Sequence, residues 1–400
     1  MNPDTEAMFT ILSDLYIIRI FSPMHINLCT SAHFFVHSCR NRGLIKHFKT
    51  GFNGFLVKKR TRQTFKKEEK MAGQLSVFLQ SEINIFLYRV FGWNIARFMV
   101  FLLGKLHFFI SFRDRKRITE AVHQAVGQGM PVKKFSGLLS KVFEGIFSHY
   151  YEKLYIAYEH APKATKFLKT AIEPDGLDLL RKKISNGKGV LMVTGHYGAI
   201  EFIPTFLAVH GFKVSMIAKF KTEQLRKKVF RQAEIYGIRL LDAGSGIDIL
   251  RTAVKELKQN RILVTECDEM EEWRPSSKQS ISFLGRVTGL DRTINALHKR
   301  TGAEVVFSLI HRHNLNKYRF IAHSVEGSVK GERCVGSELL KILEWYILQY
   351  PEQWYQWKNY FLIGASGSHA PSSRIMKVRY PAAGPFPEHA FQPLLQRVES

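Results

Sequence analysis

Hydrophobic and polar residues follow two alternating patterns over the second half of the chain. From about residue 174 onward, short runs rich in β-branched and other apolar residues are separated by longer segments with amphipathic helical spacing. The short runs predict strands over Gly189–His196, Lys213–Ala218, Ile238–Leu241, Arg261–Glu266, Glu304–Arg312 and Tyr318–His323. The longer segments predict helices over Ala199–His210, Thr222–Ile235, Ile247–Lys258, Arg292–Arg300 and Ser337–Leu348.

Strands that alternate with helices of roughly 10–15 residues are typical of βαβ units, so we expect an α/β fold with a mostly parallel sheet flanked by helices. The last two strands are expected to pair with each other. Two more helices are predicted ahead of the sheet, at Arg113–Val126 and Val132–Tyr158. Residues 366–400 contain Gly, Ser, Pro and scattered charges and predict a loose tail. The expected main domain is therefore 113–365.

The most apolar segment is Ile83–Phe112, which is interrupted by Arg89, Arg97 and Lys105. No stretch reaches roughly 18 uncharged apolar residues, the length that indicates a spanning helix. The long basic side chains can extend to the headgroup level while Phe, Leu and Trp enter the acyl boundary. We therefore expect 71–112 to form membrane-associated helices that anchor the chain in the plane of the membrane. A buried pair of core helices is the alternative.

Residues 1–70 lack helical or strand periodicity and end in the basic run VKKRTRQTFKKEEK, directly before Met71. A Lys-Glu-Glu-Lys run is what a purine-rich ribosome-binding site gives when it is translated. The hypothesis is that translation starts at Met71 and that residues 1–70 are a mis-assigned or disordered extension.

The chain of 400 residues is strongly basic, with 59 Lys and Arg against 34 Asp and Glu and a net charge of +25. Such a chain attracts anions, whether nucleic acid, anionic lipid or an acidic carrier protein. Its 31 Phe residues add apolar area that suits a membrane surface. Four cysteines without a CxxC pair argue against a zinc ribbon, an iron–sulfur site and a disulfide framework. They indicate reduced thiols in a cytosol-facing protein.

The first predicted strand runs into the sequence VTGHYGAIE, where His196 lies in a turn flanked by Gly195 and Gly198. Ligands of open α/β sheets gather outside the carboxyl ends of the strands. A histidine there can act as a general base, and a carboxylate on its other ring nitrogen fixes the tautomer and raises its basicity. Glu201, one turn into the following helix, is the candidate carboxylate. By itself this spacing fits a structural histidine equally well.

Further segments place this block in a family context. TGHYGAIE, then AKFKTEQLRKKVFRQ, ILVTECDE, ISFLGRVTGLDRTINALHKRTGAEVV and the closing PEQWYQWKNYF follow one another in order. This series resembles the bacterial lipid A biosynthesis acyltransferase family, within the glycerolipid and lysophospholipid acyltransferases, over roughly Met71 to Phe361. The resemblance implies a glycerolipid acyltransferase-like fold.

The resemblance implies that His196 is the catalytic base and Glu201 its partner. His196 would take the proton of an acceptor hydroxyl that attacks an acyl thioester, with no covalent enzyme intermediate, no metal and no further cofactor. The implied donor is acyl carrier protein or acyl-CoA. The implied acceptor is an anionic lipid A precursor. The implied place is the cytoplasmic face of the inner membrane.

Substrate-binding residues are also implied by the resemblance. A basic position after the second strand corresponds to one of Lys219, Lys221, Arg226 and Arg231, of which Arg231 is preferred. Gly285 and Arg286 match the family's phenylalanine-glycine loop, although FLGRVTGL is shorter than usual. Asp268 matches its acidic loop.

Three alternatives remain open at this point. The same chemistry could act on a lysophospholipid, an aminolipid or a glycolipid. A nucleic-acid-binding protein would fit the charge, but no helix-turn-helix, zinc-finger or RNP-like motif supports it. A non-catalytic membrane protein with an acyltransferase fold is the third, and substitution of His196 separates it from an enzyme.

Overall fold

A computed structural model describes residues 78–220, 222–246, 248–271, 274–314, 316–326 and 334–364. All of them belong to one compact unit of the chain, 65–400. The predictions made for 1–70 and 366–400 lie outside the described residues, as does the start of the expected anchor segment 71–112.

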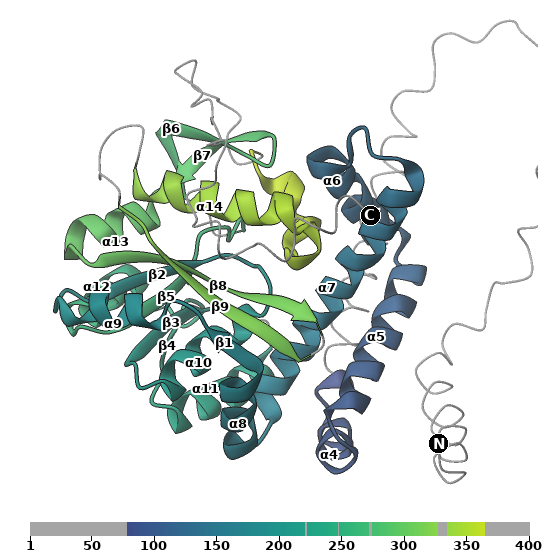
Figure 1. The fold of residues 1–400 in the computed structure, drawn as a ribbon, viewed down its shortest axis with the longest axis horizontal. Helices are drawn as coiled ribbons and strands as arrows, with labels where there is room; N and C mark the ends of the chain where they lie inside the picture. The colour runs from purple at the N-terminus through teal and green to yellow at the C-terminus, as the bar shows by residue number, and fades with distance from the viewer. Residues whose placement is uncertain are drawn as a thin grey trace, which may run out of the picture. The chain divides into compact units, whose positions relative to one another are not determined.

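A seven-stranded sheet with the order β1-β9-β8-β2-β5-β3-β4 forms the centre of the domain (Figure 1). All neighbouring pairs are parallel except β8 and β9, which pair with each other as predicted and are antiparallel. The structure therefore confirms the expected α/β fold with a mostly parallel sheet. The strands are β1 (Ile172–Pro174), β2 (Val190–Thr194), β3 (Val214–Ala218), β4 (Arg239–Asp242), β5 (Ile262–Glu266), β8 (Glu304–Asn314) and β9 (Lys317–Ser324).

Helices cover both faces of this sheet, because alternate residues of its buried strands enter two different cores. In β2, Leu191 and Val193 join one core while Val190 and Met192 join the other. The first core contains α12, α13 and α14, and the second contains α7 to α11. These helices are α7 (Val132–Tyr158), α8 (Ala161–Ala171), α9 (Leu177–Ser185), α10 (Ile203–Val209), α11 (Glu223–Ile235), α12 (Ile249–Lys258), α13 (Thr293–Thr301) and α14 (Val335–Gln349).

A two-stranded antiparallel hairpin, β6 (Pro275–Phe283) and β7 (Arg286–Asp291), packs on α14 apart from the main sheet. No strand is predicted here from the sequence, where the resemblance implies a phenylalanine-glycine loop; the first half of β6 is polar and lacks a strand pattern. After α14 the chain closes in two short 3₁₀ helices, η5 (Pro351–Gln353) and η6 (Gln356–Leu362).

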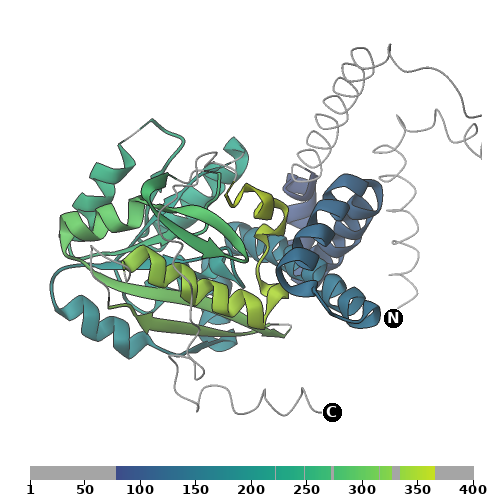
Figure 2. The ribbon, with the colours of Figure 1, turned by 90° about the horizontal axis from the view of Figure 1, so that it is seen from above.

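Ahead of the sheet stand α4 (Glu82–Phe91), α5 (Trp93–Ile110) and α6 (Phe112–Val122), which lie together at one side of it (Figures 1 and 2). The chain turns between α4 and α5 at Gly92, whose φ of 91° favours glycine. The predicted helix Arg113–Val126 ends early, because its last residues form a π-helical turn, η3 (His123–Gly127).

Helix α5 packs along one side against α7 and leaves the opposite side exposed. Trp93 contacts Tyr151 and Tyr155, and Phe101 contacts Phe147, all edge-on. Gly104 lies against the ring of Phe147, where a Cβ atom would not fit. By length and composition α5 is apolar enough to cross a membrane, with 11% of its apolar window buried.

Candidate active site

Polar residues follow the carboxyl ends of two central neighbouring strands. β2 and β5 are parallel, and Thr194 pairs with Glu266 at their ends. His196 follows β2 by two residues and Asp268 follows β5 by two residues. Because the carboxyl ends of parallel strands meet at one edge, these two side chains are brought together at the place where such sheets bind ligands.

Asp268 holds His196 through both its backbone and its ring. The Nδ1 atom of His196 lies 2.9 Å from Oδ1 of Asp268, and the backbone N–H of His196 donates to the same carboxylate at 3.0 and 3.1 Å. The indole Nε1–H of Trp354 donates to Oδ2 at 2.7 Å. Asp268 is completely buried, so its negative charge is compensated by these three donors.

The turn that carries His196 is fixed by the closing motif PEQWY. Tyr355 N–H donates to the carbonyl of His196 at 3.1 Å, and Gly198 N–H donates to the carbonyl of Gln353 at 2.9 Å. Gly198 has a φ of 56°, and a Cβ atom there would meet the carbonyl oxygen of Ile310. Glycine at 198 is therefore required both by the backbone conformation and by the close approach of β8.

A buried ion pair lies beside this turn. Arg312, on β8, donates from Nε and Nη2 to the two carboxylate oxygens of Glu152 on α7 at 2.7 and 2.8 Å. The side chains of Arg312 and Glu152 are 9% and 1% exposed. The same guanidinium donates to the carbonyl of Gly198 at 2.9 Å. The pair therefore connects α7, β8 and the His196 turn, and the bidentate geometry fixes their relative positions.

Burial and nearby carboxylates set the charge of the site. Burial by itself would lower the pKa of His196, but Asp268, Glu266 and Glu269 outweigh it and raise that pKa to about 9. Burial raises the pKa of the Glu266 carboxyl to about 7, although the nearby imidazole opposes this. The Nε2 atom of His196 lies 3.5 Å from Oε2 of Glu269, whose pKa burial also raises.

Glu201 does not occupy the place that the sequence analysis expected for it. It lies on the 3₁₀ turn η4 (Ile200–Phe202), and its Oε1 is 3.1 Å from Nζ of Lys153 and 3.7 Å from Nε2 of His149. The carboxylate on Nδ1 of His196 is Asp268 instead. The physical reason is that the 3₁₀ turn directs Glu201 toward α7, whereas Asp268 continues the strand next to β2.

An aromatic ring connects Glu201's neighbours with His196. The ring of Tyr355 stacks on His149 with centroids 3.6 Å apart, and it meets the His196 ring edge-on at 5.4 Å. Burial, and after it Lys153, keeps the pKa of His149 well below its ordinary value, so this imidazole is neutral. Glu201 thus belongs to the surroundings of His196 through His149 and Tyr355.

The basic candidates lie after β3, two strands from β2. Arg226 and Arg231 are on α11, where Arg226 donates to Asp242 at 2.6 Å and Arg231 is exposed. Lys219 directly follows the end of β3 and is exposed. Lys221 lies outside the described residues. None of the described three contacts His196 or Asp268.

Gly285 and Arg286 lie at the turn of the β6–β7 hairpin and not in a loop. Gly285 has a φ of 75°, and Nε of Arg286 donates to the carbonyl of Ile363 at 2.9 Å. This turn faces η3 and η6 and does not contact His196. Substrate binding by Gly285 and Arg286 remains a prediction.

From the sequence, His196 and Asp268 are predicted as separate site residues and not as a pair. The Glu152–Arg312 ion pair is not predicted. The pairing of His196 with Asp268 could have been expected, because each residue lies at the carboxyl end of a predicted strand, and in the structure each follows its strand by two residues. No signal for the ion pair was available, since its members lie 160 residues apart.

The arrangement suits proton transfer. If Nδ1 carries the proton that it donates to Asp268, then Nε2 is the acceptor and can take a proton from a bound hydroxyl. Among the described residues, no group of three or more His, Cys, Asp or Glu side chains is placed to hold a metal ion.

Comparison with known proteins gives a clear family assignment. The sequence model of the bacterial lipid A biosynthesis acyltransferase family matches residues 63–362 of this chain. That range includes the whole sheet and both residues of the His196–Asp268 pair. No curated protein matches the chain significantly.

Proposed function

This chain belongs to the bacterial lipid A biosynthesis acyltransferase family, whose activity is acyl transfer to a lipid A precursor, and we propose that His196 is the general base of that transfer. The observation that carries the proposal is the 2.9 Å contact between Nδ1 of His196 and the buried carboxylate of Asp268. This contact selects the tautomer in which Nε2 accepts a proton.

The chemical step follows from that tautomer. Nε2 of His196 takes the proton of the acceptor hydroxyl while the hydroxyl oxygen attacks the carbonyl carbon of the acyl thioester. The tetrahedral intermediate then expels the thiolate of the donor, and the imidazolium returns the proton to it. An ester bond forms, a thioester bond breaks, and Asp268 stabilises the imidazolium in between.

Glu201 is proposed to act on the site through Lys153 and His149. Its carboxylate compensates the ammonium of Lys153 at 3.1 Å, and the neutral His149 stacks on Tyr355 beside the base. Removing the carboxylate would leave Lys153 as an uncompensated positive charge, which would lower the pKa of His196 and move these rings. Glu201 is therefore a positioning residue in this proposal.

The donor is proposed to be an acyl thioester of acyl carrier protein or of coenzyme A. Both are anionic, and the net charge of +25 favours their approach. Exposed cations on or next to α11, Lys219 and Arg231, are candidates for that contact, together with Arg226.

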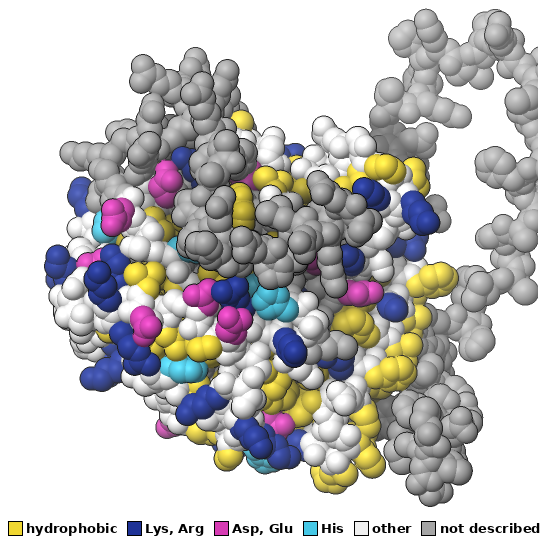
Figure 3. Space-filling view, viewed as in Figure 1, with side chains coloured by type: hydrophobic (Ala, Val, Ile, Leu, Met, Phe, Trp, Pro, Cys, Tyr) yellow, Lys and Arg dark blue, Asp and Glu magenta, His cyan; other side chains and the backbone are white. Residues whose placement is uncertain are grey.

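Helices α4 and α5 are proposed to anchor the protein in the plane of the inner membrane at its cytoplasmic face. Large apolar side chains are exposed along them, among them Phe86, Phe98, Leu102 and Phe109. Figure 3 shows hydrophobic side chains on the side of the molecule where these helices lie in Figure 1. An in-plane position is favoured because the other side of α5 packs on α7 and because the exposed Lys105 lies within the apolar stripe.

The test uses purified protein with an acyl thioester and three acceptors in parallel: a lipid A precursor, a lysophospholipid and an aminolipid. We expect acylation of the precursor alone, loss of at least about a hundredfold in His196→Ala, and normal rates in the control His160→Ala, an exposed histidine outside the site. Acylation of another acceptor alone would refute the acceptor assignment. Normal turnover by His196→Ala would refute the proposed base.

A further inference from the structure

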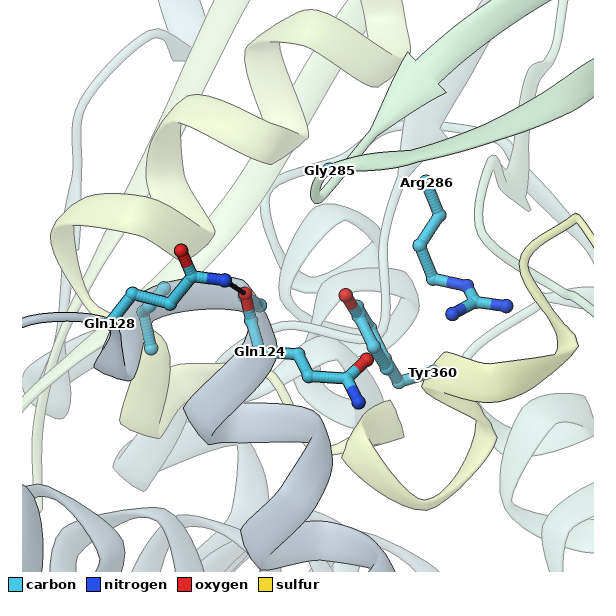
Figure 4. A pocket seen from close by; sticks show the side chains of 7 residues that line it. Gln124, Gln128, Gly285, Arg286 and Tyr360 are labelled. Atoms are coloured by element: carbon cyan, nitrogen blue, oxygen red, sulfur yellow. Dashed lines mark hydrogen bonds between the residues drawn. The ribbon is translucent and has the colours of Figure 1, made fainter.

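A polar pocket of about 500 Å³ opens at a distance from His196, between the turn η3, the β6–β7 hairpin and η6 (Figure 4). Its polar side chains are two amides, one guanidinium and one phenol. The lining residues are Gln124, Ala125, Val126, Gln128, Gly285, Arg286 and Tyr360.

The hairpin wall of this pocket is held in an unusual conformation. Leu284 and Gly285 form its two-residue turn, with φ values of 49° and 75°, which is the type I′ pattern. Leucine in that region is strained, yet Leu284 is buried. Its backbone N–H donates to the buried Glu344 carboxylate at 2.6 Å, and its carbonyl accepts from the Tyr360 hydroxyl at 3.1 Å. Strain that is maintained by such contacts is characteristic of binding sites.

This turn presents Arg286 in a fixed position at the pocket. Its Nε–H donates to the carbonyl of Ile363, and its guanidinium lies over the rings of Tyr360 and Phe361 at 5.4 and 5.6 Å. Arginine fixed at Nε still has two terminal NH₂ groups that can bind a planar or tetrahedral anion. In Figure 4 the guanidinium and Tyr360 lie on the same side of the cavity.

The opposite wall carries two amides, of which that of Gln128 donates to the backbone carbonyl of Gln124 at 3.5 Å (Figure 4). Gln124 lies in the π-helical turn η3 and Gln128 directly follows it, and both are exposed. The side-chain amide of Gln124 makes no hydrogen bond within the part of the chain that the structure describes. π-Helical turns are rare in proteins overall, and those that occur are often found at functional sites.

We propose that this pocket binds the phosphorylated sugar of the acceptor lipid, with Arg286 on the phosphate and Gln124 and Gln128 on sugar hydroxyl groups, while the buried Tyr360 supports Arg286 from below. This inference rests on the proposed function, because a lipid A precursor is a sugar phosphate that carries acyl chains. Exposed amides and a guanidinium together match that chemistry.

The pocket has a structural connection to the reacting centre. Trp354, which donates to Asp268, lies 4.8 Å from Trp357, and Trp357 lies 6.3 Å from Tyr360, measured between ring centroids. The wall of the pocket is thus joined to Asp268 through buried rings, and the proposal requires that a glycolipid with its sugar phosphate in the pocket presents a hydroxyl group to His196.

Two measurements test the pocket, one of turnover and one of binding. In steady-state kinetics, Arg286→Gln is expected to raise the KM for the acceptor about tenfold or more, as for loss of a charge-assisted hydrogen bond, and Gln124→Ala severalfold. The KM for the donor should not change. Arg181→Gln is the matched control. Arg181 is an exposed arginine on α9, and its guanidinium also lies over an aromatic ring, that of Phe212.

Binding is measured separately by phosphorus NMR with glucosamine 1-phosphate as the probe. Its signal should broaden with the wild type and equally with His196→Ala, and it should stay sharp with Arg286→Gln. An inactive enzyme that still binds the probe would thus separate the pocket from the proposed base.

Three results would overturn the assignment. An unchanged acceptor KM in both pocket variants would exclude a role in acceptor binding. A raised donor KM would show that the pocket receives a phosphate of coenzyme A. Equal broadening by Arg286→Gln would place the probe elsewhere. Gln124→Ala keeps the test decisive if Arg286→Gln unfolds, because Gln124 is exposed and supports no other element.

Discussion

Replacing Asp268 by Asn tests the central pair with almost no change of shape. An amide accepts through one oxygen only, whereas the carboxylate accepts from Nδ1 and N–H of His196 and from Nε1–H of Trp354. If the amide nitrogen faces the ring, Nδ1 must become the acceptor, and the proton moves to Nε2. The variant then holds the tautomer that cannot act as a base toward the acceptor.

The magnitude follows from the pKa of His196. In the wild type it is raised from an ordinary value of 6.5 to about 9, although burial opposes this. The difference corresponds to about 3 kcal/mol in favour of the protonated ring. This stabilisation is fully present below pH 6.5, where His196 is protonated in both the folded and the unfolded state. It is lost as the pH rises through 9, because the folded state then also releases the proton that the unfolded state has already released. Asp268 is the strongest of the groups that raise this pKa, so burial lowers the pKa below its wild-type value once that carboxylate is lost.

Kinetics against pH give the assay. Wild-type kcat/KM should rise with pH toward about 9, since only the neutral ring accepts a proton. Asp268→Asn should lower kcat by about 10²–10⁴ and move the rising limb of its residual activity to lower pH. Between pH 7 and 9 its free energy of unfolding should decline less than that of the wild type.

The control for this experiment is Glu271→Gln, an exposed carboxylate in the same loop that accepts from Asn359. It should keep the wild-type rate and pH profile. The reasoning would be refuted by an Asp268→Asn enzyme that is correctly folded and retains activity within about threefold at an unchanged pH optimum.

Three further predictions concern the support of the site and the membrane helices. Gly198→Ala should lower the free energy of unfolding by at least about 2 kcal/mol in denaturant titration, and an unchanged midpoint would contradict the account of the turn. Glu152→Gln should cost about 3–5 kcal/mol because it leaves Arg312 buried without a counter-charge. The double variant with Glu152→Met and Arg312→Leu should regain much of that stability but not the wild-type kcat. Recovery of kcat would argue against a positioning role of the ion pair. Phe98→Ser with Phe109→Ser should reduce binding to anionic vesicles at least about tenfold in co-sedimentation while the unfolding midpoint stays unchanged; retained binding would exclude these helices as the anchor.

Periodicity was sufficient to predict most of the sheet. Strands such as β2 and β5 are buried on both faces and therefore appear as uninterrupted apolar runs, while their helices have a clear amphipathic period. It failed for β1, which has only three residues, and for β6, whose first half is polar. The neighbouring helices α8 and α9, of 11 and 9 residues, were also missed. Short or exposed elements depend on tertiary contacts that no local pattern records.

The site was predictable in part for the same reason. A histidine between glycines after an apolar strand pointed to the sheet edge, and His196 lies there. The partner was assigned by closeness in sequence to Glu201, whereas pairing between neighbouring strands brings Asp268 to the ring. The pocket at Arg286 depends on a buried hairpin turn, and its strained Leu284 could not be recognised from residue type.

The measurement that tests the central claim most directly is a mass-spectrometric lipid profile of cells that lack this chain, complemented by the wild type or by His196→Ala. The account predicts a lipid A species short of one acyl chain, which the wild type restores and His196→Ala does not. Full restoration by His196→Ala, or unchanged lipid A in cells that lack the chain, would contradict it.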